Sequence, residues 1–498
     1  MSKSDTPNIL FLMVDQMKAT ASHLWGNRFC NTPGLEKLAQ NGVLYSKAFT
    51  PIPLCVPART ALFSSQYPHC NGARHNNTYM PLGVRHSFQI WKEQGLTTGL
   101  IGKNHCFEHM EDRNLFDVWC EIFHWNIPNF AWFKGAKWHR PYEAIQKAHE
   151  VRSSMRVPSS QKFDNEMPCH RSTFAYAFTD YPIEDYGTSL IAEQTRRFLE
   201  QNRRNPFVLW VSFPDPHTPY EAPRKYFENF YPDRVEIPDR ETDELETAPE
   251  RTKVLFEMLR IDKEPEEHVR GVLSAYYGLV QFIDDAVQQI MQALSDCGLA
   301  ENTIVVFCSD HGDFAGEHGM TQKGGVFYDC LVHVPLILSW QGAPWAGRTD
   351  SNLVSLLDVV PTLLKLQGIA IPPSMSGRLL PTAVDVPARE EVISEYGAGG
   401  PPFTMQDLQN REVTQGLIPL IETLKQREAE GLRKMVRTHS WKYVHDPLGD
   451  KDELYDLEND PGELSNICDE IRYKDVVAEM QRRLMDWSIQ NESFVLNR

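Results

Sequence analysis

Four short, continuous apolar runs constrain the fold of this chain more than any other feature of its sequence. Runs of this length are typical of strands that are buried on both faces of a helix-covered sheet. Helical patterns at 186–201 and 269–295 alternate with these runs. We therefore predict an α/β protein with a large doubly wound mixed sheet flanked by helices. The four runs cover residues 9–14, 98–101, 207–213 and 303–309.

Each apolar run ends in charged or polar side chains. Ligands of open α/β sheets bind beyond the carboxyl ends of the strands, so these side chains would meet at one rim. A carboxylate after a strand is often only a helix cap or a turn residue, but four such endings together are difficult to explain by capping. The pattern therefore predicts an active site at this rim. The residues concerned are Asp15, Lys103, His105, His217, Asp310 and His311.

The length of 498 residues suggests roughly two to three domains at about 150 residues each. Residues 368–387 are rich in proline and small side chains and are typical of a connecting segment. We expect a catalytic domain over residues 1–385 and a smaller C-terminal α+β domain over residues 386–498. A helix is predicted at 473–490 in the second domain.

Charge and hydropathy exclude several classes of partner. The chain has 50 Lys and Arg against 67 Asp and Glu, a net charge of −17, which argues against nucleic-acid binding. No apolar run reaches the about 18 residues of a membrane-spanning helix, so no membrane partner is expected. The run that stops at Asp15 lacks a small-residue cleavage site, which predicts a strand rather than a signal peptide, and a cytoplasmic location. The ten cysteines are spread singly and are expected to be reduced. The number of subunits stays open, a homo-oligomer included.

One cysteine stands out by its neighbours. Pro57 suits the first turn of a helix, so Cys55 is expected just before a helix N-terminus, where unpaired N–H groups favour anions. Arg59 follows one helical turn later on the same face. A nucleophile beside an anion-binding helix start and a guanidinium is suited to attack on a sulfate or phosphate ester. The competing interpretation is a buried structural cysteine.

Residues 54–59, Leu-Cys-Val-Pro-Ala-Arg, resemble the Cys-x-Pro-x-Arg signature of the type I, formylglycine-dependent sulfatases of the alkaline phosphatase superfamily. Further segments are similar to sulfatase motifs and keep the family's order from residue 8 to about residue 466. The resemblance implies an alkaline-phosphatase-like fold. It also implies that a formylglycine-generating enzyme converts Cys55 into formylglycine, whose hydrated aldehyde is the nucleophile. The matching segments are Gly-Lys-Asn-His at 102–105, His-Thr-Pro at 217–219, Ser-Asp-His-Gly at 309–312, Gly-Glu-His-Gly at 316–319 with Lys323, and Glu-Leu-Tyr-Asp-Leu at 453–457.

Two departures from the common sulfatase pattern concern the metal site. Gln16 stands where many sulfatases have a second aspartate, and His311 stands where asparagine is frequent. Both are found in choline-sulfatase-like members and in the related phosphonate monoester hydrolases. Lys103 and His105, by contrast, resemble sulfatases rather than phosphonate hydrolases. The resemblance therefore implies hydrolysis of a sulfate monoester to an alcohol and inorganic sulfate. A phosphonate monoester or phosphodiester hydrolase is the alternative, and a catalytically silent binder of sulfated ligands is a third hypothesis.

The resemblance also assigns roles to individual residues. One divalent metal is implied. Oxygen ligands favour calcium and the imidazole favours manganese, and calcium is placed first because it is the more frequent metal of the family that the chain resembles. His105 is expected to remove a proton from the sulfated form of residue 55, and His217 to assist departure of the alcohol. The substrate would be a small-molecule or saccharide sulfate ester, and an aromatic stretch at 119–142 would be either a pocket wall or a loop packed on its own domain. The implied metal ligands are Asp15, Gln16, Cys55, Asp310 and His311; the implied catalytic residues are Cys55, Arg59, Lys103, His105, His217 and Lys323; and Asn76, Lys103, His217 and Lys323 are implied to bind substrate.

Overall fold

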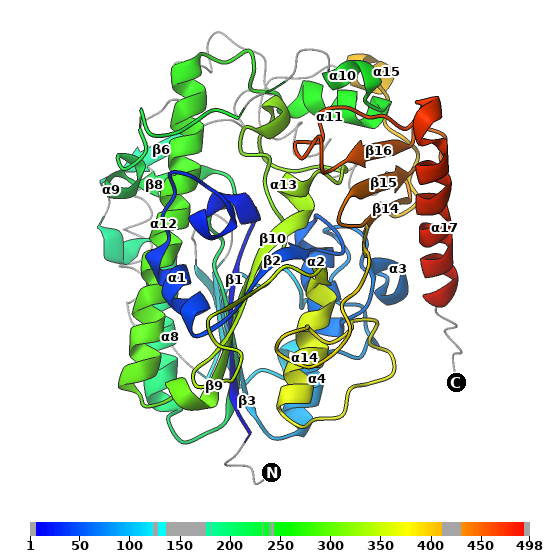
Figure 1. The fold of residues 1–498 in the computed structure, drawn as a ribbon. Coiled ribbons are helices and arrows are strands. Elements are labelled where there is room, and N and C mark those ends of the chain that lie inside the picture. Colours follow the sequence, from blue (N-terminus) through cyan, green and yellow to red (C-terminus); the bar gives the residue numbers. More distant parts are fainter. Residues whose placement is uncertain are drawn as a thin grey trace.

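A ten-stranded mixed sheet forms the centre of the molecule (Figure 1). Its four central strands are the four apolar runs, and they pair in parallel, which confirms the predicted fold class. In this computed structural model the described residues are 6–122, 128–135, 176–180, 182–231, 233–238, 240, 244–410 and 430–492. In spatial order the central strands are β9 (Thr303–Ser309), β1 (Asn8–Val14), β7 (Phe207–Ser212) and β3 (Thr97–Gly102).

Antiparallel and edge strands extend the sheet on both sides of this centre. On one side β10 pairs antiparallel with both β9 and β2, and the short strands β11 and β12 pair in parallel with β2. On the other side β4 pairs in parallel with β3, and β5 is antiparallel to β4. These strands are β2 (Gly42–Phe49), β4 (Val118–Ile122), β5 (Pro128–Lys134), β10 (His333–Trp340), β11 (Arg348–Asp350) and β12 (Val354–Ser355).

Helices cover both faces of the sheet, because side chains along each strand alternate between two cores. Leu10 and Leu12 of β1 belong to the core that includes α1, α8 and α12. Phe11 faces the opposite core with α2, α4 and α14, and its ring centroid lies 5.5 Å from that of Phe63. Figure 1 shows the two layers on either side of the sheet. These helices are α1 (Pro33–Gln40), α2 (Cys55–Ser64), α4 (Ser87–Glu93), α8 (Gly187–Gln201), α12 (Glu266–Asp296) and α14 (Val359–Leu366).

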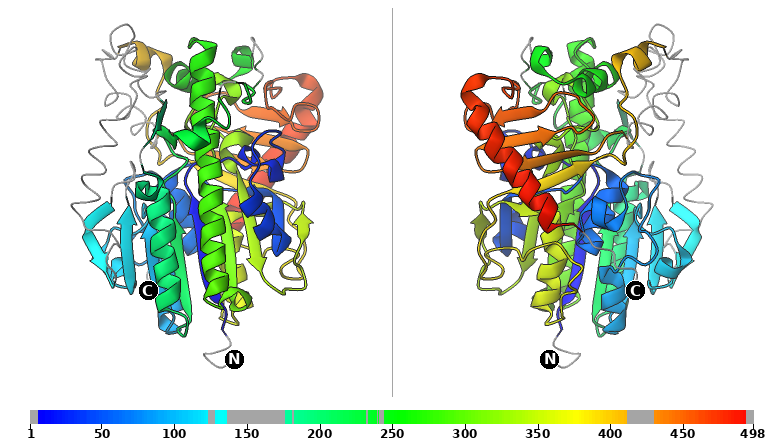
Figure 2. Two further views of the ribbon diagram at one scale, coloured as in Figure 1. Left: turned by 90° about the vertical axis from the view of Figure 1, so that its left-hand side faces the viewer. Right: turned by 90° about the vertical axis from the view of Figure 1, so that its right-hand side faces the viewer.

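A four-stranded antiparallel sheet forms the C-terminal part of the chain. One long helix, α17, crosses it, as the right-hand view of Figure 2 shows. Trp487 and Leu484 of this helix pack on Val436 and Tyr443 of the sheet. This arrangement confirms the predicted smaller α+β unit. Its elements are β13 (Val392–Tyr396), β14 (Arg433–Arg437), β15 (Trp441–His445), β16 (Glu453–Asp456) and α17 (Lys474–Gln490).

Short elements connect these layers, and buried ion pairs join the two units. Arg251 lies 3.2 Å from Asp446, and Lys442 lies 2.6 Å from Asp329. Within the described ranges, no helix is both long and apolar enough to cross a membrane. The remaining helices and strands are α3 (Pro68–Asn71), α5 (Met110–Arg113), β6 (Tyr176–Thr179), β8 (Tyr220–Pro223), α9 (Arg224–Phe227), α10 (Glu244–Thr247), α11 (Glu250–Leu259), α13 (Asp329–Val332) and α15 (Met405–Asn410).

Candidate active site

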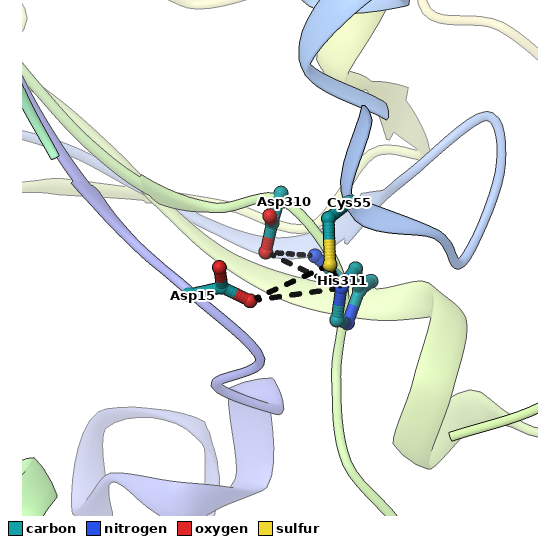
Figure 3. A group of neighbouring side chains, drawn as sticks. All are labelled: Asp15, Cys55, Asp310 and His311. Carbon is teal, nitrogen blue, oxygen red and sulfur yellow. Dashed lines mark hydrogen bonds and ion pairs between the residues drawn. The ribbon is translucent and has the colours of Figure 1, made fainter. Parts of the chain in front are cut away.

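The carboxyl ends of the central parallel strands meet at one edge of the sheet, where a group of buried side chains gathers. Asp15 follows β1, and Asp310 and His311 follow β9. Cys55, at the start of α2, points into the same group (Figure 3). One ligand atom from each of these four side chains lies within 4.8 Å of the other three. The structure therefore brings together residues that lie far apart in the sequence.

Helix α2 begins at Cys55 itself, not after it as the sequence had suggested. Proline is tolerated anywhere in the first turn, because the N–H groups there have no partner within the helix, so Pro57 does not fix the first residue. Leu54 occupies the N-cap position and has no side-chain oxygen to accept from the helix. The Asn76 side chain supplies that acceptor instead: Val56 N–H donates to its Oδ1 at 3.1 Å.

The side chain of Cys55 is only 2% exposed and lies against the strand-end residues. Its Sγ is 3.1 Å from His311 Nε2 and 3.8 Å from Asp15 Oδ1. Burial raises the pKa of the Cys55 thiol to about 11, and the nearby Asp15 carboxylate adds to this rise. An unmodified Cys55 is therefore a protonated thiol at neutral pH.

Arg59 lies one turn along α2 and is fully buried beneath the site. Its Nε donates to Asp310 Oδ2 at 2.9 Å, and its Nη2 donates to Asp15 Oδ2 at 3.1 Å. Its Nη1 donates to Ser212 Oγ, at the end of β7, at 2.8 Å. The guanidinium of Arg59 on α2 thus holds the carboxylates that follow β1 and β9 in place and is itself held by the end of β7.

The imidazole of His311 is held in one orientation by its backbone neighbour. His311 Nδ1 lies 3.0 Å from Gly312 O, so Nδ1 carries the proton and donates it, which leaves the Nε2 lone pair facing Cys55 and Asp15. Burial lowers the pKa of His311 to about 4, so the ring is neutral. A neutral imidazole with its Nδ1 occupied is the form that binds metals.

Gln16 is the fifth implied metal ligand, and both ends of its amide are engaged. Its Nε2 donates to Asp313 Oδ2 at 2.5 Å, and its Oε1 accepts from Lys323 Nζ at 2.6 Å. Tyr220 donates a second hydrogen bond to the same Asp313 oxygen at 2.7 Å. An ionised Asp313 carboxylate accepts hydrogen bonds and donates none. The nitrogen of the Gln16 amide must therefore face Asp313, and its oxygen must face Lys323.

Among the remaining predicted residues, Lys103 contacts Asp15, Lys323 contacts Gln16 and His217 contacts Lys323. Lys103 Nζ forms an ion pair with Asp15, and burial lowers the pKa of Lys103 although Asp15 opposes this. Burial raises the pKa of Asp15, but the neighbouring cations, Lys103 foremost, outweigh burial and hold that pKa well below its usual range. His217 Nε2 lies 3.1 Å from Lys323 Nζ. His105 follows two residues after Lys103 in a left-handed conformation with φ of 43°, which directs the chain sharply at the strand end.

Of two further implied features, one makes a contact within the protein, so that its contact with substrate stays a prediction, and the other lies partly outside the described residues. Asn76 was expected to contact substrate, and its amide oxygen caps α2. Of the aromatic stretch 119–142, Trp119 is buried in β4 and residues 128–134 form β5. Residues 123–127 and 136–142 lie outside the described part of the chain.

Sequence reasoning missed two residues that organise the site. Asp313 and Ser212 bind Gln16 and Arg59 respectively, rather than facing the group themselves. Asp313 stands three residues after Asp310, and Ser212 is the last but one residue of the apolar run 207–213. That position is the only signal available, because polar residues near strand ends are common for reasons of capping alone.

The donor set fits a divalent cation. Two carboxylates and one imidazole, whose Nε2 faces Cys55 Sγ, offer ligand atoms within 4.8 Å of one another and of that sulfur. The amide oxygen of Gln16, the further implied ligand, is oriented by Asp313 and Lys323. Buried carboxylates at this density require a compensating positive charge, which the described structure supplies through Arg59 and Lys103. The oxygen donors suit calcium, and the imidazole nitrogen favours manganese.

Comparison with known proteins identifies close architectural relatives. A model of the Sulfatase family matches residues 7–369. The chain is 27% identical over 485 residues to the "Uncharacterized sulfatase YidJ" of Escherichia coli, which covers 97% of this chain and 87% of that protein. It is 28% identical over 487 residues to the choline-sulfatase of Rhizobium meliloti, with 94% and 83% covered. Among solved structures, the phosphonate monoester hydrolase of Agrobacterium radiobacter superposes with a TM-score of 0.75 at 22% identity, covering 98% of this chain and 97% of that one. A 2-O GAG sulfatase superposes with a TM-score of 0.70 at 22% identity, covering 98% and 93%.

Proposed function

Because this chain belongs to the sulfatase family, a family of sulfuric ester hydrolases in the alkaline phosphatase superfamily, we propose that it hydrolyses a sulfate monoester with a formylglycine made from Cys55 and a bound divalent metal. The products would be an alcohol and inorganic sulfate. The observation that carries this proposal is the buried convergence of Cys55, at the first residue of a helix, with Asp15, Asp310 and His311.

The metal would be held by Asp15, Asp310, His311 and the amide oxygen of Gln16. We propose calcium, with manganese as the alternative. When bound, it would supply Lewis acidity toward a sulfate oxygen and lower the pKa of a hydroxyl on modified residue 55. The group at residue 55 that faces the metal would occupy the position of Sγ, which is 3.1 Å from His311 Nε2.

The side chains around this point have distinct tasks. Arg59 would keep the carboxylates of Asp15 and Asp310 in place, which its two short contacts support. Lys103 and Lys323 would neutralise charge on the sulfate oxygens, and preorganised cations of this kind commonly supply the largest share of catalysis. The chain has a net charge of −17, so such cations must dominate the local potential for an anionic substrate to enter.

Two histidines would handle protons. His217, whose Nε2 lies beside Lys323 Nζ at 3.1 Å, would donate to the departing alcohol. His105 would accept a proton from a hydroxyl of modified residue 55 after the alcohol has left. Asn76 would act mainly by capping α2, with contact to substrate as a second task.

The class of substrate follows from the relatives only in outline. One curated relative at 28% identity is named a choline-sulfatase, and another, at 24% identity over 514 residues, is a delta 4,5-hexuronate-2-O-sulfatase of Bacteroides thetaiotaomicron. We propose a small-molecule or saccharide sulfate ester for this chain.

Mass spectrometry and metal removal test the proposal together. Conversion of the Cys55 thiol to an aldehyde lowers the intact mass by about 18 Da, and Cys55→Ala should abolish turnover. A protein that is active with an unmodified Cys55, or in which Cys55→Ala keeps more than a few per cent of the rate, contradicts the nucleophile. Full activity after chelation of divalent ions contradicts the metal. An unmodified, inactive protein that still binds sulfated sugars would be a silent binding member.

A second candidate function has its own supporting observation. Gln16 and His311 are the residues that resemble phosphonate monoester hydrolases, and both would hold the proposed metal; His311 lies in the buried group with Asp15, Cys55 and Asp310. The alternative is therefore hydrolysis of a phosphonate monoester or phosphodiester. Paired kcat/KM values on an aryl sulfate and an aryl phosphonate separate the two, because each 1.4 kcal/mol of preference is about tenfold in rate.

A further inference from the structure

A cavity of about 290 Å³ lies between the segment around α3 and the C-terminal unit. Its walls come from α3 and the turn that follows, the ends of β13 and β14, and the end of α17. Figure 2 shows α17 and the strands of the C-terminal sheet that border it. The volume is close to the about 300 Å³ at which small-molecule sites begin. Six charged side chains line this α3–α17 cavity: His69, Arg74, Glu395, Arg433, Lys434 and Glu492.

Three of the four basic side chains in the α3–α17 cavity are already engaged within the protein. His69 and Lys434 both contact the buried Glu395 carboxylate. Arg433 donates to Glu430 O at 3.1 Å, and its guanidinium lies 5.5 Å from the ring centroid of Tyr396. Glu395 is thereby neutralised, and these groups form a fixed wall rather than a ligand-binding set.

Arg74 differs from the other three. It is partly buried, and no hydrogen bond or ion pair connects its guanidinium to any residue in the described part of the chain. The other unneutralised charge of the cavity, Glu492, is an exposed residue near the end of the described chain. A guanidinium with five N–H donors and no acceptor is suited to a planar or tetrahedral anion.

The α3–α17 cavity is connected through the chain to the nucleophile. Arg74 stands two residues before Asn76, whose side chain accepts from Val56 next to Cys55. Successive Cα atoms are about 3.8 Å apart, so the Cα atoms of Arg74 and Asn76 are at most about 7 Å apart. Ile52, three residues before Cys55, is part of the cavity wall. The cavity and the catalytic group therefore share one loop-and-helix unit.

We propose that the α3–α17 cavity binds a second anionic group, a sulfate or a carboxylate, of a saccharide substrate whose scissile sulfate lies at Cys55, and that Arg74 makes the charged contact. The inference rests on the proposed sulfatase function and narrows its substrate class to saccharides that carry at least two negative charges. The neighbouring aromatic and aliphatic side chains, Tyr396 and Ile52, would pack on the sugar ring.

The test measures binding in a form of the enzyme that cannot turn substrate over. In the Cys55→Ala protein, isothermal calorimetry would compare N-acetylglucosamine 6-sulfate with glucosamine 2-N,6-O-disulfate, and further monosulfated and disulfated pairs with the sulfate at other hydroxyls. The disulfated sugars should bind about 10- to 100-fold more tightly, the range expected for one charge-assisted hydrogen-bonded contact. Arg74→Ala should remove that difference and leave the monosulfated affinity unchanged, and Arg74→Lys should restore part of it.

Arg472→Ala provides the matched control, because it removes the same charge from an exposed ion pair with Glu470 outside the cavity wall. Melting temperatures should be unchanged in Arg74→Ala, since that side chain makes no described polar contact. Equal affinities for both sugars in the Cys55→Ala protein, a preference that survives Arg74→Ala, or no binding of disulfated sugars at all would each overturn the inference. Failure of the proposed function is seen separately, as absence of turnover of every sulfate ester by the modified wild-type enzyme.

Discussion

Replacing Asp313 by asparagine should turn the side-chain amide of Gln16 around. Asp313 Oδ2 accepts from Gln16 Nε2 at 2.5 Å, while its Oδ1 accepts from the backbone N–H groups of Ala315 and Gln322. An asparagine keeps one oxygen, which the two backbone donors would retain, and it presents an NH₂ group to Gln16. Two donors then face each other at this distance, and rotation of the Gln16 amide removes the conflict. The rotation places the Gln16 nitrogen, instead of its oxygen, beside Lys323.

The size of the effect follows from the contacts that change. The variant loses the oxygen of Gln16 that we propose as a metal ligand, and it directs an NH₂ group at the ammonium of Lys323, so that two donors face each other where Lys323 Nζ donated to Gln16 Oε1. Leaving one such buried polar group unsatisfied costs about 1–3 kcal/mol. With about 1.4 kcal/mol per factor of ten, Asp313→Asn should weaken metal binding by about 5- to 150-fold.

Calorimetric titration of the metal-free protein with Ca²⁺ and with Mn²⁺ measures this loss directly, without a need for turnover. The double variant Gln16→Glu with Asp313→Asn provides the decisive control. Its new carboxylate accepts from the asparagine NH₂ and from Lys323 at once, and the net charge of the group is the same as in the wild type. Metal affinity should therefore recover. An Asp313→Asn protein with wild-type metal affinity, or a double variant no better than the single one, would refute this account of Gln16.

Three further predictions concern histidines. Although burial opposes it, hydrogen bonds to Cys70 and Glu395 raise the pKa of His69 from 6.5 to about 9. The stabilisation of the folded state by protonated His69 is therefore complete below pH 6.5 and is lost as the pH rises to 9. Urea titrations at pH 6.5 and at pH 9 should show that the wild type loses up to about 3 kcal/mol of unfolding free energy over this range, whereas His69→Gln does not. The same pH dependence of stability in both proteins would contradict the pairing of His69 with Glu395. His217→Ala should reduce the rate on alkyl sulfates more than on activated aryl sulfates, and equal losses would remove its role as proton donor. His105→Ala should release alcohol in one burst and then stall with a sulfate adduct on residue 55, whereas a linear time course would argue against it.

The sequence predicted the parts of the fold that depend on local burial. The run at 303–309 has no polar interruption, and it forms a central strand with both faces covered. Because strands of this kind are parallel, the residues that follow them, such as Asp15 and Asp310, had to reach one edge of the sheet. The ends of helices were less accurate. The helix predicted from 269 begins at Glu266, because its first turn is polar and lies outside the apolar periodicity.

Contacts made across the fold could not be read from the sequence. Nothing around Asp313 distinguishes a residue that orients Gln16 from a turn former, since the two residues are 297 positions apart. The cap of α2 is similar: the position before Cys55 is a leucine, and the acceptor arrives from Asn76, twenty residues after Val56. Partners of this kind are selected by the packing of strands and helices, which local propensity does not encode.

The burial of Cys55 has a consequence for the order of events in the life of the protein. With 2% of its surface exposed at the start of a helix that is buried on all sides, its side chain is out of reach of another protein once α2 has packed on the sheet. On the proposed modification, the modifying enzyme must therefore meet an extended segment around residue 55, during synthesis or before the sheet closes. Molecules that fold first would be stable, well-packed and permanently inactive. The yield of active enzyme would then depend on the rate of modification relative to the rate of folding. Later exposure of the folded protein to the modifying enzyme would not increase that yield.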